Sequence, residues 1–201
     1  DDALIARRVG AAFGDARLEQ LPTPLRVAAT SATTGRPVVL TRGRVTDALR
    51  ASMAVPIIFP SVEIDGQRLV DGVLSDPLPI AAAPEAAVVL TLGFTGDMPR
   101  RVDRLSRLVA QTSTTLINNL MHARMAAAQA AGQQVVAIDL ALDRHVGLWD
   151  TSAMPYLFDA GRRAAEAALP RITTALERQA PPPRRRLPVT PSTAFAFSTP
   201  D

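Results

Sequence analysis

The chain has 201 residues, of which 47% are hydrophobic and 20% are charged, and its formal net charge is +3. This length and balance predict one globular domain with a full core and exclude a wholly disordered chain. The absence of cysteine excludes disulfides, thiolate chemistry and cysteine-based zinc sites, and two histidines are too few for a histidine-rich metal site. All 22 basic residues are arginine, which indicates GC-rich coding and a bacterial source and excludes Schiff-base lysine chemistry.

The hydrophobic pattern predicts short strands that alternate with helices. Helices are expected at residues 3–13, 45–54, 101–131 and 157–179, the last one interrupted by Pro170. Strands are expected at residues 25–31, 37–41, 62–64, 67–70, 87–92 and 135–140. The Asp65-Gly66 pair predicts a hairpin with a type I′ turn, because glycine accepts the positive φ that this turn requires. The alternation indicates an α/β sheet with helices on both faces.

Composition divides the chain into two parts. Residues 1–180 are expected to form one domain, and no internal repeat is visible. Residues 181–201 begin with three prolines and three arginines and continue in proline, serine and threonine, so we expect a poorly ordered tail. The longest apolar stretches fall well short of the roughly 18 residues that suggest a membrane span.

The segment after the predicted hairpin carries the densest chemical signal. Asp71 leaves a strand directly into Gly72, and Pro77 and Pro79 stiffen the loop that follows. Open α/β sheets place their sites at the carboxyl ends of strands, so a carboxylate here is a candidate for catalysis. An Asp-Gly pair after a strand is also a common turn, which leaves a purely structural role open.

Several segments together resemble the patatin-like phospholipase family, most closely its bacterial members. The similarity covers about residues 3–178, and the Ser-Met-Ala-Val-Pro and Val-Asp-Gly combination is its most specific part. The segments are Leu21–Thr30, Thr34–Val38, Arg50–Pro60, Val70–Gly72, Asp76–Pro79 and Tyr156–Leu176. The resemblance implies a three-layer α/β/α fold with a mostly parallel central sheet, whose N-terminal part is missing from this chain.

The same resemblance implies a lipid acyl-ester hydrolase with a serine–aspartate dyad. Asp71 matches the family's catalytic aspartate, and Gly72 and Val73 follow it in the motif, where the family has glycine or alanine in place of Val73. The family's G-x-S-x-G nucleophile elbow and glycine-rich oxyanion loop are absent, since none of the nine serines has glycines two residues away on both sides. The nucleophile is therefore expected on an N-terminal segment or on a second chain, and this chain alone is expected to be inactive.

Other candidate residues favour plainer interpretations. Ser52 lacks an elbow, and His122 and His145 are better explained as solvated or hydrogen-bonded side chains than as members of a Ser-His-Asp triad. The cluster of Arg100, Arg101, Arg104 and Arg107 favours a solvated helix start, with attraction to anionic lipid headgroups as the alternative.

The implied partners and location follow from the same resemblance. We expect a lipid or small acyl-ester substrate and no metal or organic cofactor. No nucleic acid is expected, since only 4% of residues are aromatic and no nucleic-acid module is present. The location is expected to be cytoplasmic or at the periphery of a membrane. The alternative function is a patatin-like interaction domain without catalysis.

Overall fold

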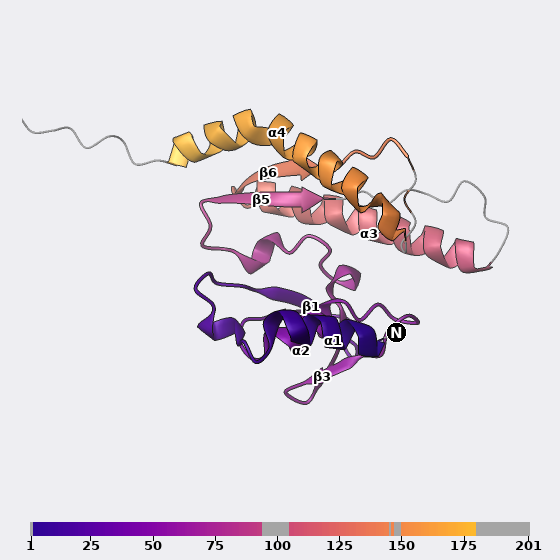
Figure 1. The fold of residues 1–201 in the computed structure, drawn as a ribbon. Helices are drawn as coiled ribbons and strands as arrows, with labels where there is room; N and C mark the ends of the chain where they lie inside the picture. The colour runs from indigo at the N-terminus through magenta and orange to yellow at the C-terminus, as the bar shows by residue number, and fades with distance from the viewer. Residues whose placement is uncertain (1, 94–104, 145, 147–149, 180–201) are drawn as a thin grey trace, which may run out of the picture.

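The computed structural model describes residues 2–93, 105–144, 146 and 150–179. Figure 1 shows two sets of elements: an N-terminal set around β1, α1 and α2, and a C-terminal set around β5, β6, α3 and α4. The predicted tail, residues 181–201, lies outside the described residues, as do His145 and the first residues of the helix predicted at 101–131.

The N-terminal half is built on a four-stranded antiparallel sheet with the strand order β2-β1-β4-β3. Its strands are β1 (Val27–Ser31), β2 (Pro37–Leu40), β3 (Val62–Ile64) and β4 (Gln67–Asp71). The inner strands β1 and β4 pair with Ala29 opposite Asp71. The β3–β4 hairpin confirms the predicted type I′ turn, since Asp65 and Gly66 have φ values of 51° and 74°.

The expected mostly parallel sheet is not confirmed, because three of the four described strand pairs are antiparallel. For two of these antiparallel pairs, β1–β2 and β3–β4, the physical reason is the length of the connections. Residues 32–36 join β1 to β2, and a two-residue turn joins β3 to β4. Parallel neighbours need a crossover of about a dozen residues or more, and such short turns can join only antiparallel strands.

Two helices pack beside this sheet, α1 (Asp2–Phe13) and α2 (Val45–Ser52). Helix α2 packs on β1 and β4 through fully buried residues on one face, and α1 packs on α2. The core of this half consists of two buried clusters. One contains Leu18, Val27, Val45 and Ala48, and the other contains Ala29, Ala51 and Leu69. The small side chains of Ala48 and Ala51 let the helix approach the sheet closely.

The C-terminal half contains a parallel pair, β5 (Val88–Gly93) and β6 (Gln134–Asp139), joined by α3 (Leu105–Ala130). This strand–helix–strand unit confirms the α/β pattern predicted for this stretch. Helix α4 (Met154–Gln179) runs along β6 and β5 and contacts both, and α3 contacts β6 (Figure 1). Short 3-10 turns complete the described chain, at Leu18–Gln20, Gly72–Leu74, Ile80–Ala82 and Thr151–Ala153.

The apolar residues that repeat at helical spacing along α3 do not form one buried stripe. Leu108 and Leu116 are 47% and 64% exposed, and Ala123 is exposed as well. The side of α3 that turns inward carries Arg124, whose guanidinium reaches the N-terminal half. Hydrophobic periodicity identified the helix and its length, but it did not identify the face that packs against the described residues.

The predicted interruption at Pro170 is wrong, because α4 continues through it as one helix. Proline removes one N–H and with it one hydrogen bond to the carbonyl four residues earlier. Pro170 and Glu166, which carries that carbonyl, both lie on the exposed side of the helix, where water can replace the missing donor. Ala168 and Ala175 are buried on either side of Pro170 and hold the two halves of the helix in line.

Candidate active site

Asp71 is the last residue of β4, and its carboxylate folds back over the turn that follows. Its Oδ1 accepts a hydrogen bond of 2.8 Å from the amide of Val73, and this is the only hydrogen bond to the carboxylate within the described part of the chain. The Asp71 amide donates to the carbonyl of Ala54 at 3.0 Å, which fixes the strand end beside the end of α2. Oδ2 is therefore left to accept a proton from a reacting group.

Gly72 is required by a close backbone approach. A Cβ atom at this position would lie 2.6 Å from the carbonyl oxygen of Ala28 and 2.8 Å from its carbonyl carbon. Real Cβ contacts with backbone are never this short, so the turn cannot lie against β1 with any other residue. Val73 needs no such restriction, since the turn uses its backbone amide and its side chain is half-buried. The departure from glycine or alanine at position 73 thus leaves the turn intact.

A pair of buried hydroxyls holds the backbone of Asp71. The Thr30 hydroxyl donates to the carbonyl of Asp71 at 2.7 Å, and the Ser75 hydroxyl lies 2.7 Å from the same Thr30 oxygen. Since the Thr30 proton is used on Asp71, Ser75 is the donor of the second bond. Ser75 and Asp76 also donate their amides to the carbonyl of Gly72, at 3.2 and 2.9 Å. These side-chain and backbone hydrogen bonds together hold the turn in one conformation.

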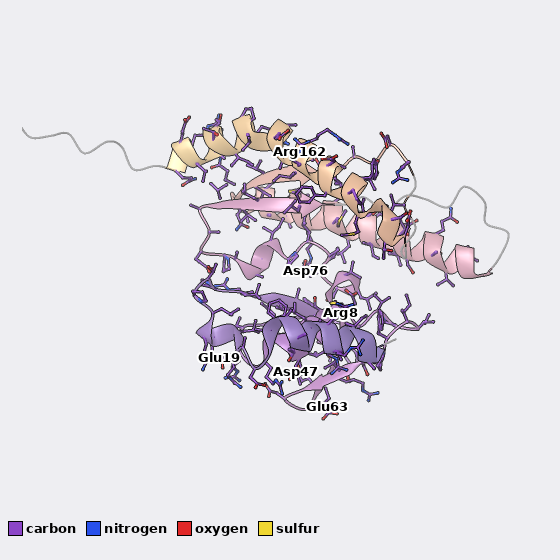
Figure 2. All side chains as sticks on the ribbon, in the orientation of Figure 1. Arg8, Glu19, Asp47, Glu63, Asp76 and Arg162 are labelled. Carbon is purple, nitrogen blue, oxygen red and sulfur yellow. The ribbon has the colours of Figure 1, made fainter. Side chains whose placement is uncertain are left out.

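An ion pair connects this turn to the C-terminal half. Arg124 of α3 donates from Nη2 to the carbonyl of Ser75 at 2.9 Å, and its Nε lies 3.1 Å from Oδ1 of Asp76. Nε and Oδ1 are both buried but poorly aligned for a hydrogen bond, so their contact is mainly ionic. Figure 2 shows Asp76 between the N-terminal sheet and α3.

Electrostatics favour a basic carboxylate at Asp71. Burial raises the pKa of Asp71 above its ordinary value of 3.8, and the hydrogen bond from Val73 opposes this in part. Burial also raises the pKa of Asp76, and the charge of Arg124 opposes that rise. No cation faces Asp71 in a comparable way among the described residues, so the two carboxylates differ in environment although they share one loop.

Of the other residues singled out from the sequence, those that the structure describes are not brought to this turn. Ser52 is half-buried at the end of α2 and makes no hydrogen bond to Asp71 in the described structure. His122 is exposed on α3, as expected for a solvated side chain, and His145 lies outside the described residues. Arg100, Arg101 and Arg104 also lie outside them, and Arg107 is in the first turn of α3.

Sequence reasoning missed the residues that support the turn, which are Thr30, Ser75 and Arg124. Thr30 carried a signal, because a threonine inside an apolar strand must find a partner when it is buried. Arg124 carried none, since its position on a long exposed helix resembles that of any solvated arginine. Its role depends on how α3 folds back over residues more than forty positions earlier in the chain.

Among the described residues, no group of three or more histidine, cysteine, aspartate or glutamate side chains is arranged to hold a metal ion. Within the same residues, none of the helices has the length and apolar character needed to cross a bilayer.

The part of the chain that carries this site is similar to a known protein family. Residues 1–84, which include Asp71 and its turn, match the sequence model of the patatin-like phospholipase family. The chain is 35% identical over 111 residues to uncharacterized NTE family proteins of Mycobacterium bovis and of two strains of Mycobacterium tuberculosis. The match covers 50% of this chain and 31% of each relative, so the chain spans less than a third of their length. The similarity to the patatin-like family inferred from sequence motifs is confirmed.

Proposed function

We propose that this chain supplies the general base, Asp71, of a lipid acyl-ester hydrolase that uses a serine–aspartate dyad. The observation that carries the proposal is the Asp71 carboxylate itself. It is half-buried at the end of an inner strand, its pKa is raised by burial, and Oδ2 remains available. It also lies inside the region that matches a phospholipase family.

In the proposed reaction the serine hydroxyl lies next to Oδ2 of Asp71. As the serine oxygen attacks the ester carbonyl, its proton passes to Asp71, and the departing alcohol then takes that proton as the carbon–oxygen bond breaks. Water attacks the resulting acyl-serine, Asp71 accepts a proton from it, and the proton returns to the serine oxygen when the fatty acid leaves. No histidine is needed, because a carboxylate with a raised pKa takes the proton directly.

The nucleophile is proposed to come from a segment outside residues 1–201, or from a second chain, that carries a G-x-S-x-G elbow. The absence of that motif from this sequence supports the proposal. We therefore expect no turnover of a short p-nitrophenyl ester by the purified chain alone. Clear turnover by the chain alone would overturn this part of the proposal and direct attention to Ser52.

The test of the dyad combines this chain with the elbow-bearing segment and compares two matched substitutions. Asp71→Asn keeps the volume but cannot accept a proton, so turnover should fall by about 10²- to 10⁴-fold, the usual contribution of a general base. Asp65→Asn makes the same chemical change in the exposed hairpin turn, where asparagine tolerates positive φ, and should leave turnover unchanged.

The pH dependence gives a second measurement of the same group. Activity should rise as Asp71 loses its proton, and the midpoint of this rise in kcat/KM should lie above 3.8, because burial raises the pKa of Asp71. An active complex in which Asp71→Asn retains more than a tenth of parental turnover would refute the assignment of the base. A complex that stays inactive with the elbow restored would favour an interaction domain without catalysis.

A further inference from the structure

The loop between α2 and β3 exposes large apolar side chains to solvent. Ile57 is 98% exposed, Ile58 is 46% exposed, and Met53 at the base of the loop is 39% exposed. We call these three residues the apolar tip. Scattered single hydrophobic residues are normal on a protein surface, but here three exposed ones fall within six residues of one connection.

The backbone of this loop holds Ile57 outward in a strained conformation. Ile57 has a φ of 75°, in the left-handed region that a β-branched residue rarely adopts. The amides of Ile58 and Phe59 both donate to the carbonyl of Val55, at 3.1 and 2.9 Å, so the turn is hydrogen-bonded around the strained residue. Strain of this kind is concentrated at functional sites, where the surrounding structure maintains it.

The apolar tip lies near the strand end that carries Asp71 and near α1, which carries the exposed Arg8. The loop begins after Ala54, whose carbonyl accepts the Asp71 amide at 3.0 Å. At its other side, Met53 lines a small hollow together with Ile5 of α1 and Arg50 of α2. Arg8 follows Ile5 by one helical turn on α1 and is exposed (Figure 2).

We propose that the apolar tip inserts into the boundary between headgroups and acyl chains of an anionic phospholipid bilayer, with Arg8 at the headgroups. This inference rests on the lipid substrate proposed above, since it places the membrane surface beside the strand end that carries Asp71. An interfacial element combines apolar side chains that enter the acyl boundary with basic residues that meet anionic lipid.

The size of the tip selects a bilayer over a second protein surface. A stable protein interface buries about 800 Å² on each partner and needs a complementary shape. Three side chains on one loop cannot supply that area. A bilayer takes in protruding apolar groups without a matching surface, because its acyl chains rearrange around them.

The experiment measures co-sedimentation of the 201-residue chain with vesicles, which requires no hydrolysis. One set of vesicles contains phosphatidylcholine alone and the other contains phosphatidylcholine with phosphatidylglycerol. Ile57→Asn relieves the strain, because asparagine tolerates positive φ, and should weaken binding to both sets by about tenfold or more. Ile57→Leu keeps an apolar side chain and should retain binding.

Two further variants separate the apolar and the ionic contributions. Arg8→Gln should weaken binding to the anionic vesicles by about fivefold and leave binding to neutral vesicles unchanged. Leu116→Asn is the matched control, since Leu116 is 64% exposed on α3, away from the loop, and should bind as the parent does. Circular dichroism of each variant checks that the fold is retained.

The proposal is overturned if the parent chain does not bind the anionic vesicles, or if Ile57→Asn binds as well as Leu116→Asn. A concentration-dependent dimer that is lost in Ile57→Asn without lipid would show that a second copy covers the tip instead. Asp71→Asn should bind vesicles as the parent does. Unaltered turnover of Asp71→Asn in the complex with the elbow-bearing segment would refute the proposed base without affecting the vesicle result.

Discussion

Replacing Asp76 by asparagine removes the carboxylate that faces Arg124 and keeps nearly the same volume. Breaking a fully buried ion pair costs about 3–5 kcal/mol, because one charge is left without a partner. Here the partners are unequal, since the side chain of Asp76 is 8% exposed and that of Arg124 is 36% exposed. Arg124 can regain water, so we expect Asp76→Asn to lower the free energy of unfolding by about 1–3 kcal/mol.

The reverse substitution leaves the more buried charge alone and should cost more. Arg124→Gln removes the cation and also its bond to the Ser75 carbonyl, so we expect a loss of about 2–4 kcal/mol at neutral pH. Burial then acts alone on Asp76 and raises its pKa further. A carboxyl whose pKa is higher in the folded than in the unfolded state destabilises the fold at pH values above the pKa of the unfolded state. The effect of Arg124→Gln should therefore shrink as the pH falls toward and below 3.8.

Urea unfolding of the parent, both single variants and the double variant at several pH values measures this interaction as a thermodynamic cycle. We expect the double variant to be more stable than the sum of the single effects predicts, by about 1–2 kcal/mol. Additivity within about 0.3–0.5 kcal/mol at neutral pH would show that the two side chains do not interact and would refute the reasoning.

Three further substitutions test the turn and the core by thermal or urea unfolding. Gly72→Ala places a Cβ against the backbone of Ala28 and should destabilise by about 2–4 kcal/mol, whereas Gly10→Ala in open space on α1 should stabilise slightly. Leu69→Ala removes a fully buried side chain and should cost about 2–5 kcal/mol. Asp71→Asn should change stability by no more than about 1–2 kcal/mol, with any gain largest at neutral pH and lost on acidification, because burial raises the pKa of Asp71.

Each of these three predictions can be contradicted by a specific result. If Gly72→Ala unfolds like Gly10→Ala, the turn does not lie against β1 as the structure places it. A loss below about 1 kcal/mol for Leu69→Ala would contradict its burial between α2 and the sheet. A large loss of stability in Asp71→Asn at neutral pH would show that the charge supports the fold and is not held there for chemistry.

The sequence predicted elements better than it predicted their arrangement. The strands at 62–64 and 67–70, the turn between them and the parallel strands at both ends of α3 follow from local patterns that the fold respects. Strand order could not be read in the same way, because Ala29 and Asp71 pair across more than forty residues. The alternation of apolar and polar residues along a strand shows that the strand has two faces, but it does not show which other strand it pairs with.

The residues of the candidate site also divide into those that local sequence predicts and those that it does not. Asp71 and Gly72 were identified from a short motif, and the structure supplies the reason for the glycine, which is the backbone of Ala28. Thr30 and Arg124 support the turn from far away in the sequence, through a hydroxyl and a guanidinium. Such contacts depend on the packed fold and produce no periodic pattern in the sequence.

The position of Asp71 on an inner strand also has a consequence for hydrogen exchange. β4 lies between β1 and β3, so the amides that it donates within the sheet open only when the sheet itself opens, and the Asp71 amide is held by the carbonyl of Ala54. The neighbouring loop from Val55 to Pro60 belongs to no ladder, and its amides should exchange much faster. The carboxylate of Asp71 therefore lies at the end of a slowly exchanging strand, beside a loop outside the sheet whose amides should exchange faster.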